Sequence, residues 1–304
     1  MQRLYVNRDG PIYTYAISFM ETHWGVKGTF PGCQPVSIEY THFPVLKSQP
    51  YAVCEKTDGT RYMLLAFMFE NKKRCVFVNR ALDMFECPLN FRKPIYEGTI
   101  LEGELYEDTF MIYDCLLASG TVVGNKNFID RLDDVEKVVK MLTVLKYDPI
   151  KMKVKKIYML NDFELFMNEY LPTVTQKIDG LIFTPIRATI KTGTHETMFK
   201  WKPRDKNTID FQFKKKGTTW RLYVQDRGKL IFESEIHEDQ VPREVHVEED
   251  AIVECQYMHQ DEPMWWKPVQ RRHDKTYPNG RRTFYRTLVN IKEDIKMVDF
   301  LSCT

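Results

Sequence analysis

Short apolar runs separated by polar turn residues fill most of the first part of the chain, and this pattern is typical of strands. Two such runs, Tyr51 to Cys54 and Tyr62 to Phe69, flank a polar stretch that contains Asp58-Gly59. Asp-Gly between two apolar runs is a strong signal for a tight turn, so we expect these runs to form a hairpin. Further strands are predicted at Arg74–Phe85 (a pair), Thr99–Tyr106, Phe110–Leu117, Gly180–Pro185 and Met198–Lys202. Residues 1–30 predict no clear element.

Between these strands the apolar residues take a helical period. In the first such stretch they are Phe128, Ile129, Leu132, Val135, Val138, Val139 and Leu142. Asn127 is the expected N-cap, with Asp130 in the first turn. Asn161 and Glu164 resemble a capping box for a second helix, which Pro172 ends.

A polar junction at Pro203–Asn207 marks the expected domain boundary. The strands predicted beyond it are Ile209–Lys214, Trp220–Gln225, Lys229–Glu233 and Ile252–Met258, with a hairpin turn at Asp226-Arg227-Gly228. Short strands at this spacing predict a small antiparallel barrel. A second capping-box pattern at Asn290 predicts a terminal helix with Ile291, Ile295, Val298 and Leu301 on one face.

Composition excludes several classes of protein. The chain has 304 residues, 43% of them apolar, and a net charge of +2, so the core is ample and no global basic field is expected. The seven cysteines show no CxxC spacing, which argues against a disulfide framework or a structural zinc site and favours a reducing compartment. No apolar run approaches a membrane span, and Asn7, Arg8 and Asp9 interrupt the first one, so neither a membrane segment nor a signal peptide is expected.

Lysines and arginines are nevertheless unevenly distributed. They concentrate at Lys146–Lys156, Lys200–Lys206, Lys214–Lys216 and Lys267–Arg286. Local basic patches on a nearly neutral protein suit a bound polyanion such as a nucleotide or RNA. For Lys214–Lys216 a solvated surface is the simpler interpretation.

Lys56 is the main candidate for chemistry. A lysine is normally protonated, with a pKa of about 10.4, and becomes nucleophilic when burial and nearby cations lower that pKa. Its companions on or beside strands are the cations Arg61, Arg80, Lys200 and Lys202, the carboxylates Glu104 and Asp179, and the aromatic Tyr113. Cations bind phosphates, carboxylates hold Mg²⁺ and an aromatic ring stacks on a base, so together they suit a nucleoside triphosphate beside a nucleophile. The alternative is an ordinary Asp-Gly hairpin with surface charges.

The order of the motifs resembles that of the covalent nucleotidyltransferases, which include mRNA capping guanylyltransferases and polynucleotide ligases. The matching segments are Lys56-Thr57-Asp58-Gly59-Thr60-Arg61, Glu102-Gly103-Glu104, Met111-Ile112-Tyr113-Asp114, Asp179-Gly180-Leu181-Ile182-Phe183, Phe199-Lys200-Trp201-Lys202-Pro203 and Trp266-Lys267 with Arg272-His273-Asp274-Lys275. Asp179, where ligases usually carry glutamate, and the RxDK pattern of the last segment favour the capping branch, of the short type found in large DNA viruses. Pro35 to Glu39 also resembles the capping-type approach to the lysine motif.

This resemblance implies a reaction in two steps. Lys56 attacks the α-phosphorus of GTP to form lysyl-GMP, and the 5′-diphosphate end of RNA then takes the GMP to give the GpppN cap. Lys200 and Lys202 would neutralise the α-phosphate, while Arg272, Asp274 and Lys275 would act on the β- and γ-phosphates. Arg61, Arg80 and Glu104 would hold the ribose, Tyr113 would stack on guanine, and Asp179 with Glu104 would bind Mg²⁺ or Mn²⁺. Glu55, next to the nucleophile, is included among the GTP-binding residues.

The resemblance also assigns guanine recognition to the lysine-rich segment Asp148 to Lys156. The residue that aligns with the guanine-contacting lysine is Lys155, with Lys153 as a competitor. Alternate residues of an extended segment share one face, so direction alone does not separate Lys151, Lys153 and Lys155. The alternative is a solvated basic strand that meets RNA phosphates.

The implied fold class is α+β. A nucleotidyltransferase domain of the ATP-grasp-like, DNA-ligase/capping-enzyme type, with antiparallel sheets and flanking helices, spans residues 1–205. An OB-fold barrel follows at 206–289, and a helix at 290–304 packs back on the first domain. We expect an intracellular monomer, in the nucleus or a viral factory or virion, with RNA triphosphatase and cap methyltransferase on separate chains. Two other functions remain open: an ATP-dependent RNA or DNA ligase, and an inactive module that binds RNA 5′ ends.

Overall fold

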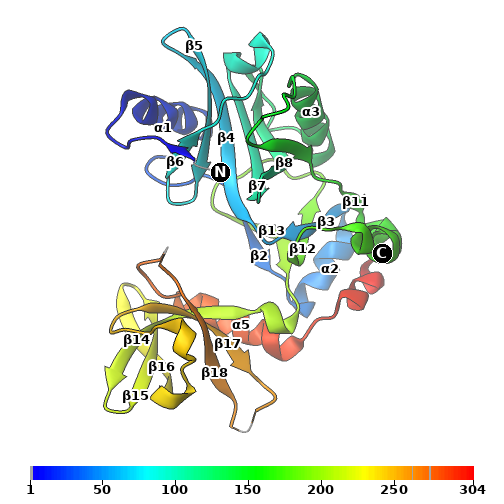
Figure 1. Ribbon diagram of the computed structural model, residues 1–304. Helices are drawn as coiled ribbons and strands as arrows, with labels where there is room; N and C mark the ends of the chain where they lie inside the picture. The colour runs from blue at the N-terminus through cyan, green and yellow to red at the C-terminus, as the bar shows by residue number, and fades with distance from the viewer. Residues whose placement is uncertain (1–2, 262, 274) are drawn as a thin grey trace. The chain divides into compact units, whose positions relative to one another are not determined.

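The structure is a computed structural model that describes residues 3–261, 263–273 and 275–304 (Figure 1). Contacts between residues divide the chain into two units. The first consists of Met1–Val36, Pro44–Lys200 and Leu301–Thr304, and the second of Ser37–Phe43 and Trp201–Phe300. The chain therefore passes from one unit to the other more than once.

The larger sheet of the first unit has eight strands. Its order is β1-β6-β5-β4-β7-β8-β10, with β9 beside β8, and only the pairing of β8 with β10 is parallel. The strands are β1 (Leu4–Tyr5), β4 (Thr60–Phe69), β5 (Lys72–Asn79), β6 (Met84–Glu86), β7 (Thr99–Tyr106), β8 (Thr109–Ala118), β9 (Thr121–Val122) and β10 (Lys151–Val154). The strands predicted at residues 74–85, 99–106 and 110–117 are confirmed.

A second sheet has five strands in the order β11-β3-β12-β13-β2. They are β2 (Gln34–Ser37), β3 (Tyr51–Thr57), β11 (Tyr158–Met159), β12 (Ile178–Pro185) and β13 (Thr194–Trp201). The strands predicted at 180–185 and 198–202 are confirmed, although the second begins four residues earlier and ends at Trp201.

The predicted hairpin between β3 and β4 is wrong. The strands are consecutive, but β3 pairs with β11 and β12, whereas β4 pairs with β5 and β7. Asp58 donates its backbone N–H to Lys177 O at 2.9 Å, and a Cβ added to Gly59 would lie 2.7 Å from Leu105 O. Glycine is needed here because the backbone approaches β7 closely. The chain therefore changes sheets between Lys56 and Arg61.

Two helices cover opposite faces of the eight-stranded sheet, α1 (Pro11–Trp24) and α3 (Phe128–Lys140) (Figure 1). Met63 and Leu65 of β4 belong to the apolar cluster that contains α1, while the intervening Leu64 belongs to the cluster that contains α3. Because both faces are buried, β4 is apolar along most of its length and shows no alternation. The prediction of α3 is confirmed, and the Asn127 side chain accepts the Asp130 N–H. The helix α1 was not predicted.

The second predicted helix is present in an irregular form. It comprises a 3₁₀ turn, α4 (Phe163–Leu165), a π-helical turn at Phe166–Tyr170 and a final 3₁₀ turn that contains Pro172. The capping box expected from Asn161 is wrong, since the first residues carry no side-chain cap. Phe163 and Phe166 are fully buried, so tertiary packing outweighs the local signal. A short helix, α2 (Phe43–Ser48), precedes β3.

The second unit contains a five-stranded antiparallel sheet in the order β16-β15-β14-β17-β18. Its strands are β14 (Thr208–Lys216), β15 (Thr219–Asp226), β16 (Lys229–His237), β17 (Ile252–Met258) and β18 (Trp265–Arg271). The first four were predicted and are confirmed, as is the hairpin between β15 and β16, where Arg227 and Gly228 have φ of 49° and 78°. The last strand was missed, and Pro268 within it weakens its strand signal.

The terminal helix α5 (Arg281–Glu293) differs from the prediction. It begins well before Asn290 and ends at Glu293, with Asp294 in the left-handed conformation. Asn290 lies inside the helix and donates its side-chain amide to Ile38 O at 2.7 Å. Its capping-box signature was therefore misinterpreted, because the polar side chain makes a long-range bond within the second unit.

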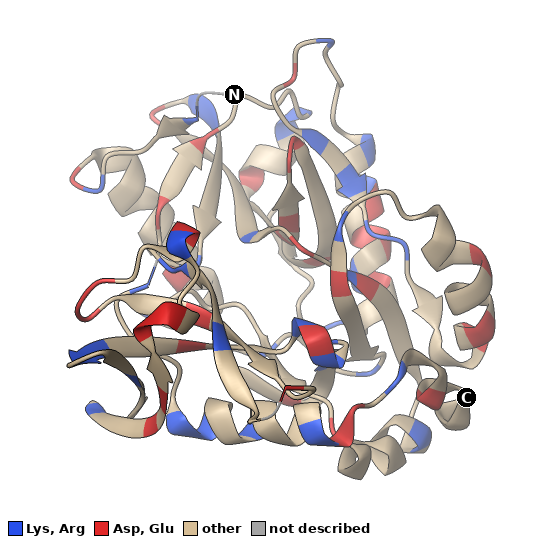
Figure 2. Cartoon of the chain, turned by 60° about the horizontal axis from the view of Figure 1, so that its bottom comes forward, with Lys and Arg blue, Asp and Glu red and all other residues tan. Residues whose placement is uncertain are grey.

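Other expectations concern the whole chain. All seven cysteines are free and buried. Among the described residues no helix is long and apolar enough to cross a membrane. Basic and acidic residues both occur along the ribbon of each unit (Figure 2).

His195 on β13 gives the fold a predicted pH dependence. The side chain is 3% exposed, its Nε2 has no hydrogen-bond partner among the described residues, and burial lowers its pKa, helped by Lys191 and Arg131. Below about pH 6.5 the unfolded chain therefore binds more protons than the folded one, and stability falls as the pH drops through the folded pKa. We expect the wild-type Tm to fall more between about pH 7.5 and 5.5 than that of His195→Gln. If Tm fell with pH in parallel in wild type and His195→Gln, this prediction would be wrong. The control is His237→Gln, which replaces an exposed histidine.

Candidate active site

Lys56 forms an ion pair with Asp179. The sequence analysis predicted Lys56 as the nucleophile and Asp179, separately, as a metal ligand. The Lys56 Nζ lies 2.8 Å from Asp179 Oδ1, and the two side chains are 23% and 12% exposed. The register between β3 and β12 shifts between Ile178 and Gly180, so Asp179 sits in a β-bulge opposite Lys56. A bulge redirects a side chain, and here the carboxylate meets the lysine.

Glu104 is the second carboxylate near this lysine. Its Oε1 accepts the Gly59 backbone N–H at 3.2 Å, which ties it to the segment after Lys56. The pKa of Glu104 is raised, mainly by burial. The charges of Lys56 and Lys155 act to lower this pKa, and the charge of Asp179 acts to raise it. Glu104 and Asp179 therefore repel each other electrostatically across the region of Lys56.

These two carboxylates suit a divalent cation. Among the described residues no group of three or more histidines, cysteines and carboxylates could hold a metal alone. Mg²⁺ is commonly bound by one or two carboxylates together with waters and substrate phosphates, so Asp179 and Glu104 fit that ion. A cation between them would also relieve their mutual repulsion.

A neighbouring cluster holds Arg61 and Tyr113 in fixed positions. Arg61 Nε donates to Glu102 Oε1 at 2.6 Å, and the Tyr113 hydroxyl donates to the same oxygen at 3.2 Å. A Cβ on Gly32 would lie 2.6 Å from Arg61 NH2, so a larger residue there would force the guanidinium to shift. Arg80, which the sequence placed at the ribose with Arg61, donates to Gln34 Oε1 at 2.9 Å. The Arg61–Glu102 pair thus fixes the positions of one predicted ribose contact and one predicted base contact.

Lys155 lies near the nucleophile, and its neighbours in the basic segment do not share its environment. β10 ends at Val154, so the alternation that would have put Lys151, Lys153 and Lys155 on one face does not extend to Lys155. Lys155 is 5% exposed, whereas the other two are exposed. Its Nζ donates to Thr57 Oγ1 at 2.9 Å and lies 3.8 Å from Glu55 Oε1.

The remaining predicted cations lie around the division between the units and in the second unit. Lys200 is the last residue of its segment in the first unit and Lys202 belongs to the second; both are half-buried. Arg272 NH1 lies 3.2 Å from both carboxylate oxygens of Asp210, and Lys275 Nζ donates to Asp210 Oδ2. Asp274 lies outside the described residues.

Comparison with known proteins identifies the family. The sequence profile of the mRNA capping enzyme catalytic domain matches residues 13–204. The chain belongs to this family. The predicted membership of the capping branch is thereby confirmed.

Two curated relatives show the extent of the similarity to other capping enzymes. The mRNA-capping enzyme of Mus musculus is 30% identical over 280 residues, which cover 84% of this chain and 46% of the mouse protein. The mRNA-capping enzyme subunit alpha of Schizosaccharomyces pombe is 28% identical over 324 residues, covering 90% of this chain and 79% of the yeast protein. The chain thus spans about half the length of the mouse enzyme. Among solved structures, a mycobacterial DNA ligase D complexed with ATP and MES matches with a TM-score of 0.45 and 12% identity, over 81% of this chain and 95% of that one.

One residue of the capping-family motifs has a structural role. Asp114 follows Tyr113 on β8, but its carboxylate accepts from Arg131 Nε at 2.7 Å and from Arg131 NH2 at 3.1 Å. Arg131 also donates NH1 to Lys126 O and Ala188 O, and its side chain is 2% exposed. This buried pair joins α3 to β8, so Asp114 holds the strand that carries Tyr113 in place.

Several residues that organise the site were not predicted. Glu102, Asp210, Gln34 and Thr57 each hold a predicted residue through an ion pair or hydrogen bond. A carboxylate two residues before Glu104 was a visible signal for Glu102. Nothing in the local sequence indicated Asp210, because its partners lie more than sixty residues away.

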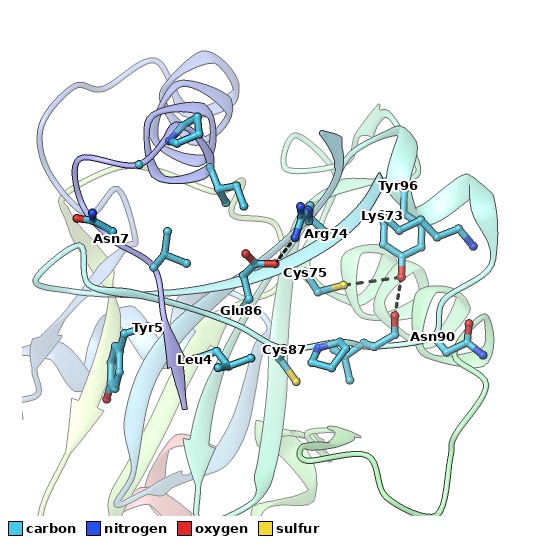
Figure 3. Close-up of a pocket in the computed structure, with 16 residues that line it drawn as sticks. Leu4, Tyr5, Asn7, Lys73, Arg74, Cys75, Glu86, Cys87, Asn90 and Tyr96 are labelled. Atoms are coloured by element: carbon cyan, nitrogen blue, oxygen red, sulfur yellow. Dashed lines mark hydrogen bonds and ion pairs between the residues drawn. The ribbon is translucent and has the colours of Figure 1, made fainter. Parts of the chain in front are cut away.

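A separate cavity of about 620 Å³ lies in the first unit (Figure 3), and no predicted site residue lines it. Its walls come from the N-terminal segment, β5, the end of β6 and the loop after it, and include Arg74 paired with Glu86 at 3.0 Å. The predicted catalytic and binding residues therefore lie outside this cavity.

Proposed function

We propose that the chain is an mRNA guanylyltransferase that transfers GMP from GTP to the 5′-diphosphate end of RNA through lysyl-GMP. The observation that carries the proposal is the placement of Lys56 against Asp179 in a chain of the mRNA capping enzyme family. In the first step Lys56 Nζ bonds to the α-phosphorus, and the bond to the bridging oxygen breaks to release pyrophosphate. In the second step a β-phosphate oxygen of the RNA end bonds to the same phosphorus, the P–N bond breaks and the nitrogen recovers a proton.

Lys56 must lose a proton before it attacks. In the proposed reaction the Lys56–Asp179 ion pair opens, because the lysine nitrogen bonds to phosphorus and Asp179 is a proposed metal ligand. A divalent cation, Mg²⁺ or Mn²⁺, would be held by Asp179 and Glu104 and would supply neutralisation of phosphate charge. Lys200 and Lys202 add positive charge for the α-phosphate, and Arg61, Arg80 and Glu104 position the ribose. Tyr113 supplies the stacking surface for the base.

The second unit completes the proposed enzyme. We infer that its five-stranded sheet is the OB-fold of a capping enzyme, at residues 206–289, followed by a C-terminal segment at 290–304 that packs on the first domain. Arg272 and Lys275, assembled on Asp210, would bind the β- and γ-phosphates with the help of Asp274. Triphosphatase and methyltransferase partners on other chains, a monomeric state, an intracellular location and the short viral type are further parts of the proposal.

The direct test is covalent labelling. The protein is incubated with Mg²⁺ or Mn²⁺ and GTP or ATP labelled at the α-phosphate, then separated on a denaturing gel. Label from GTP supports the proposal. Label from ATP alone supports an ATP-dependent ligase, and no label from either supports an inactive module that binds RNA ends.

Arg272→Ala and Lys275→Ala are expected to block lysyl-GMP formation while sparing transfer of GMP from preformed lysyl-GMP to RNA. The β- and γ-phosphates of GTP are present only in the first step, so cations dedicated to them act only there. The two half-reactions are measured separately by single-turnover labelling and by chase with diphosphate-ended RNA. Arg271→Ala, which removes an adjacent arginine paired with Glu248, is the matched control. Equal loss in both half-reactions would rule out this division of roles.

Lys155→Ala is expected to narrow the preference for GTP over ATP. Guanine offers O6 as an acceptor where adenine presents an amino group, so a lysine ammonium, which only donates, favours guanine. One such contact corresponds to about 1–3 kcal/mol of discrimination. The measurement is the rate of covalent labelling with GTP, ITP and ATP. Because ITP retains O6, its labelling rate should fall as much as that of GTP. Lys153→Ala is the control, and a Lys155→Ala protein that keeps its GTP preference but binds RNA with a shallower salt dependence would favour a phosphate contact.

A further inference from the structure

Glu55 is a buried carboxylate immediately before the proposed nucleophile. The residue is 1% exposed, and its Oε2 atom is buried. Gln176 Nε2 donates to its Oε1 at 3.2 Å, and Tyr170 borders the same carboxylate, whose charge adds to burial in raising the pKa of Tyr170. Glu55 is therefore surrounded by protein side chains, and its contacts show which of them it can hold.

Lys155 is that neighbour. Glu55 and Thr57 alternate with Lys56 along β3, so they point to the opposite face from the nucleophile. Lys155 approaches this face, with its ammonium 2.9 Å from Thr57 Oγ1 and 3.8 Å from Glu55 Oε1. Burying an ammonium is costly unless a counter-charge and hydrogen bonds compensate. Glu55 supplies the counter-charge for Lys155, which is buried, whereas Lys151 and Lys153 are exposed.

We propose that Glu55 is the positioning residue that holds the Lys155 ammonium at the guanine site and thereby sets the preference for GTP. This inference rests on the proposed function. Lys155 has three N–H donors, and among the described residues it gives one to Thr57. The hydrogen bond to Thr57 and the ion pair with Glu55 hold the ammonium in place, and guanine O6 can accept one of its remaining donors. A lysine ammonium only donates, so it cannot accept a hydrogen bond from the adenine amino group.

Replacement of Glu55 by glutamine keeps the shape of the side chain and removes its charge. The Lys155 ammonium would then be buried without a counter-charge, and its long side chain can relieve this by moving to solvent. The base contact is lost, while the proposed phosphate and metal groups around Lys56 remain. The effect should therefore fall on discrimination between bases, and much less on the rate at saturating nucleotide.

The experiment is single-turnover covalent labelling with GTP and with ATP over a range of nucleotide concentrations, in wild type, Glu55→Gln, Lys155→Ala and the double variant. We expect Glu55→Gln to reduce the GTP-over-ATP ratio by roughly ten-fold or more, mainly through weaker GTP binding, within the range of one base contact. In the Lys155→Ala background the same change should have no further effect on the ratio, since a residue that acts through Lys155 cannot act without it. Glu86→Gln, which removes a half-buried carboxylate paired with Arg74, is the matched control.

The outcomes separate this inference from the proposed function. If wild type forms no GMP adduct, the proposed function fails. If wild type prefers GTP but Glu55→Gln loses GTP and ATP labelling equally, or changes the ratio as much without Lys155, the positioning role is wrong. Should Glu55→Gln fold poorly, Glu55→Asp retains the charge but shortens the side chain, and an unchanged ratio with an unchanged Lys155 reactivity to reductive methylation would also overturn the inference.

Discussion

Lys56→Ala and Lys56→Arg are both expected to abolish covalent labelling by GTP. Alanine removes the nitrogen that forms the bond to phosphorus. Arginine keeps a positive charge that can still pair with Asp179, which lies 2.8 Å from the lysine nitrogen. Its guanidinium stays protonated at any pH the protein tolerates, so it cannot attack the phosphorus. The arginine variant therefore separates nucleophilicity from charge, and the measurement is radiolabel retained on the protein after denaturation.

The matched control is Lys177→Arg. Lys177 pairs with Asp58 in the segment next to the site, but its side chain is 65% exposed, so its replacement should leave labelling intact. Mass spectrometry of the labelled wild type should place the GMP on the peptide that contains Lys56. Label that persists in either Lys56 variant, or that maps to another lysine, would contradict the assignment.

Asp114→Ala is expected to destabilise the first unit by about 3–5 kcal/mol, because it leaves the Arg131 guanidinium buried without its carboxylate. The pair is bidentate and almost fully enclosed, and Arg131 also bonds two backbone carbonyls. Replacing both partners, as in Asp114→Ala with Arg131→Met, should cost less than the single change because no buried charge remains. Urea unfolding followed by far-UV circular dichroism gives the free energies.

The comparison pair for that measurement is Glu136 with Lys140 on α3, which is exposed and has an N–O distance of 3.7 Å. Exposed pairs contribute about 0–1 kcal/mol, so Lys140→Met should have little effect. A loss for Asp114→Ala as small as that, or a double variant less stable than the single one, would show that the buried pair does not anchor α3 to the sheet.

Local sequence signals predicted the elements well and their partners poorly. Runs of apolar residues identified most strands, and the helical period with Asn127 located α3. Asp58-Gly59 was correctly predicted to be a tight connection. The pairing of the strands on either side of it depends on residues far along the chain. Gly59 is required by its approach to Leu105, and β3 pairs with residues more than a hundred positions away. Asn290 is a similar case, since its local capping signature conceals a bond to Ile38.

The candidate site shows the same limit. The motif order led to the family and to Lys56, Asp179 and Lys155. The spacing of Glu102 before Glu104 was a visible signal, but the ion pair of Arg272 with Asp210 left no periodic or local trace, because the two residues lie more than sixty positions apart. Lys155 could not be separated from Lys153 by alternation, and only the end of β10 at Val154 and the burial beyond it distinguish the two.

The way the chain is shared between the two units bears on how it can be divided. By its contacts, the segment Ser37–Phe43 belongs to the same unit as Trp201–Phe300, although more than 150 residues of the first unit lie between the two segments. Within that second unit the Tyr40 backbone N–H binds Glu293 at 3.0 Å and its hydroxyl binds Asp299 at 2.7 Å. A fragment cut at Lys200 would separate these partners onto two polypeptides. Expression of the halves should therefore yield a C-terminal piece that lacks one of its own segments, and a permuted or co-expressed peptide carrying residues 37–43 would be needed to restore it.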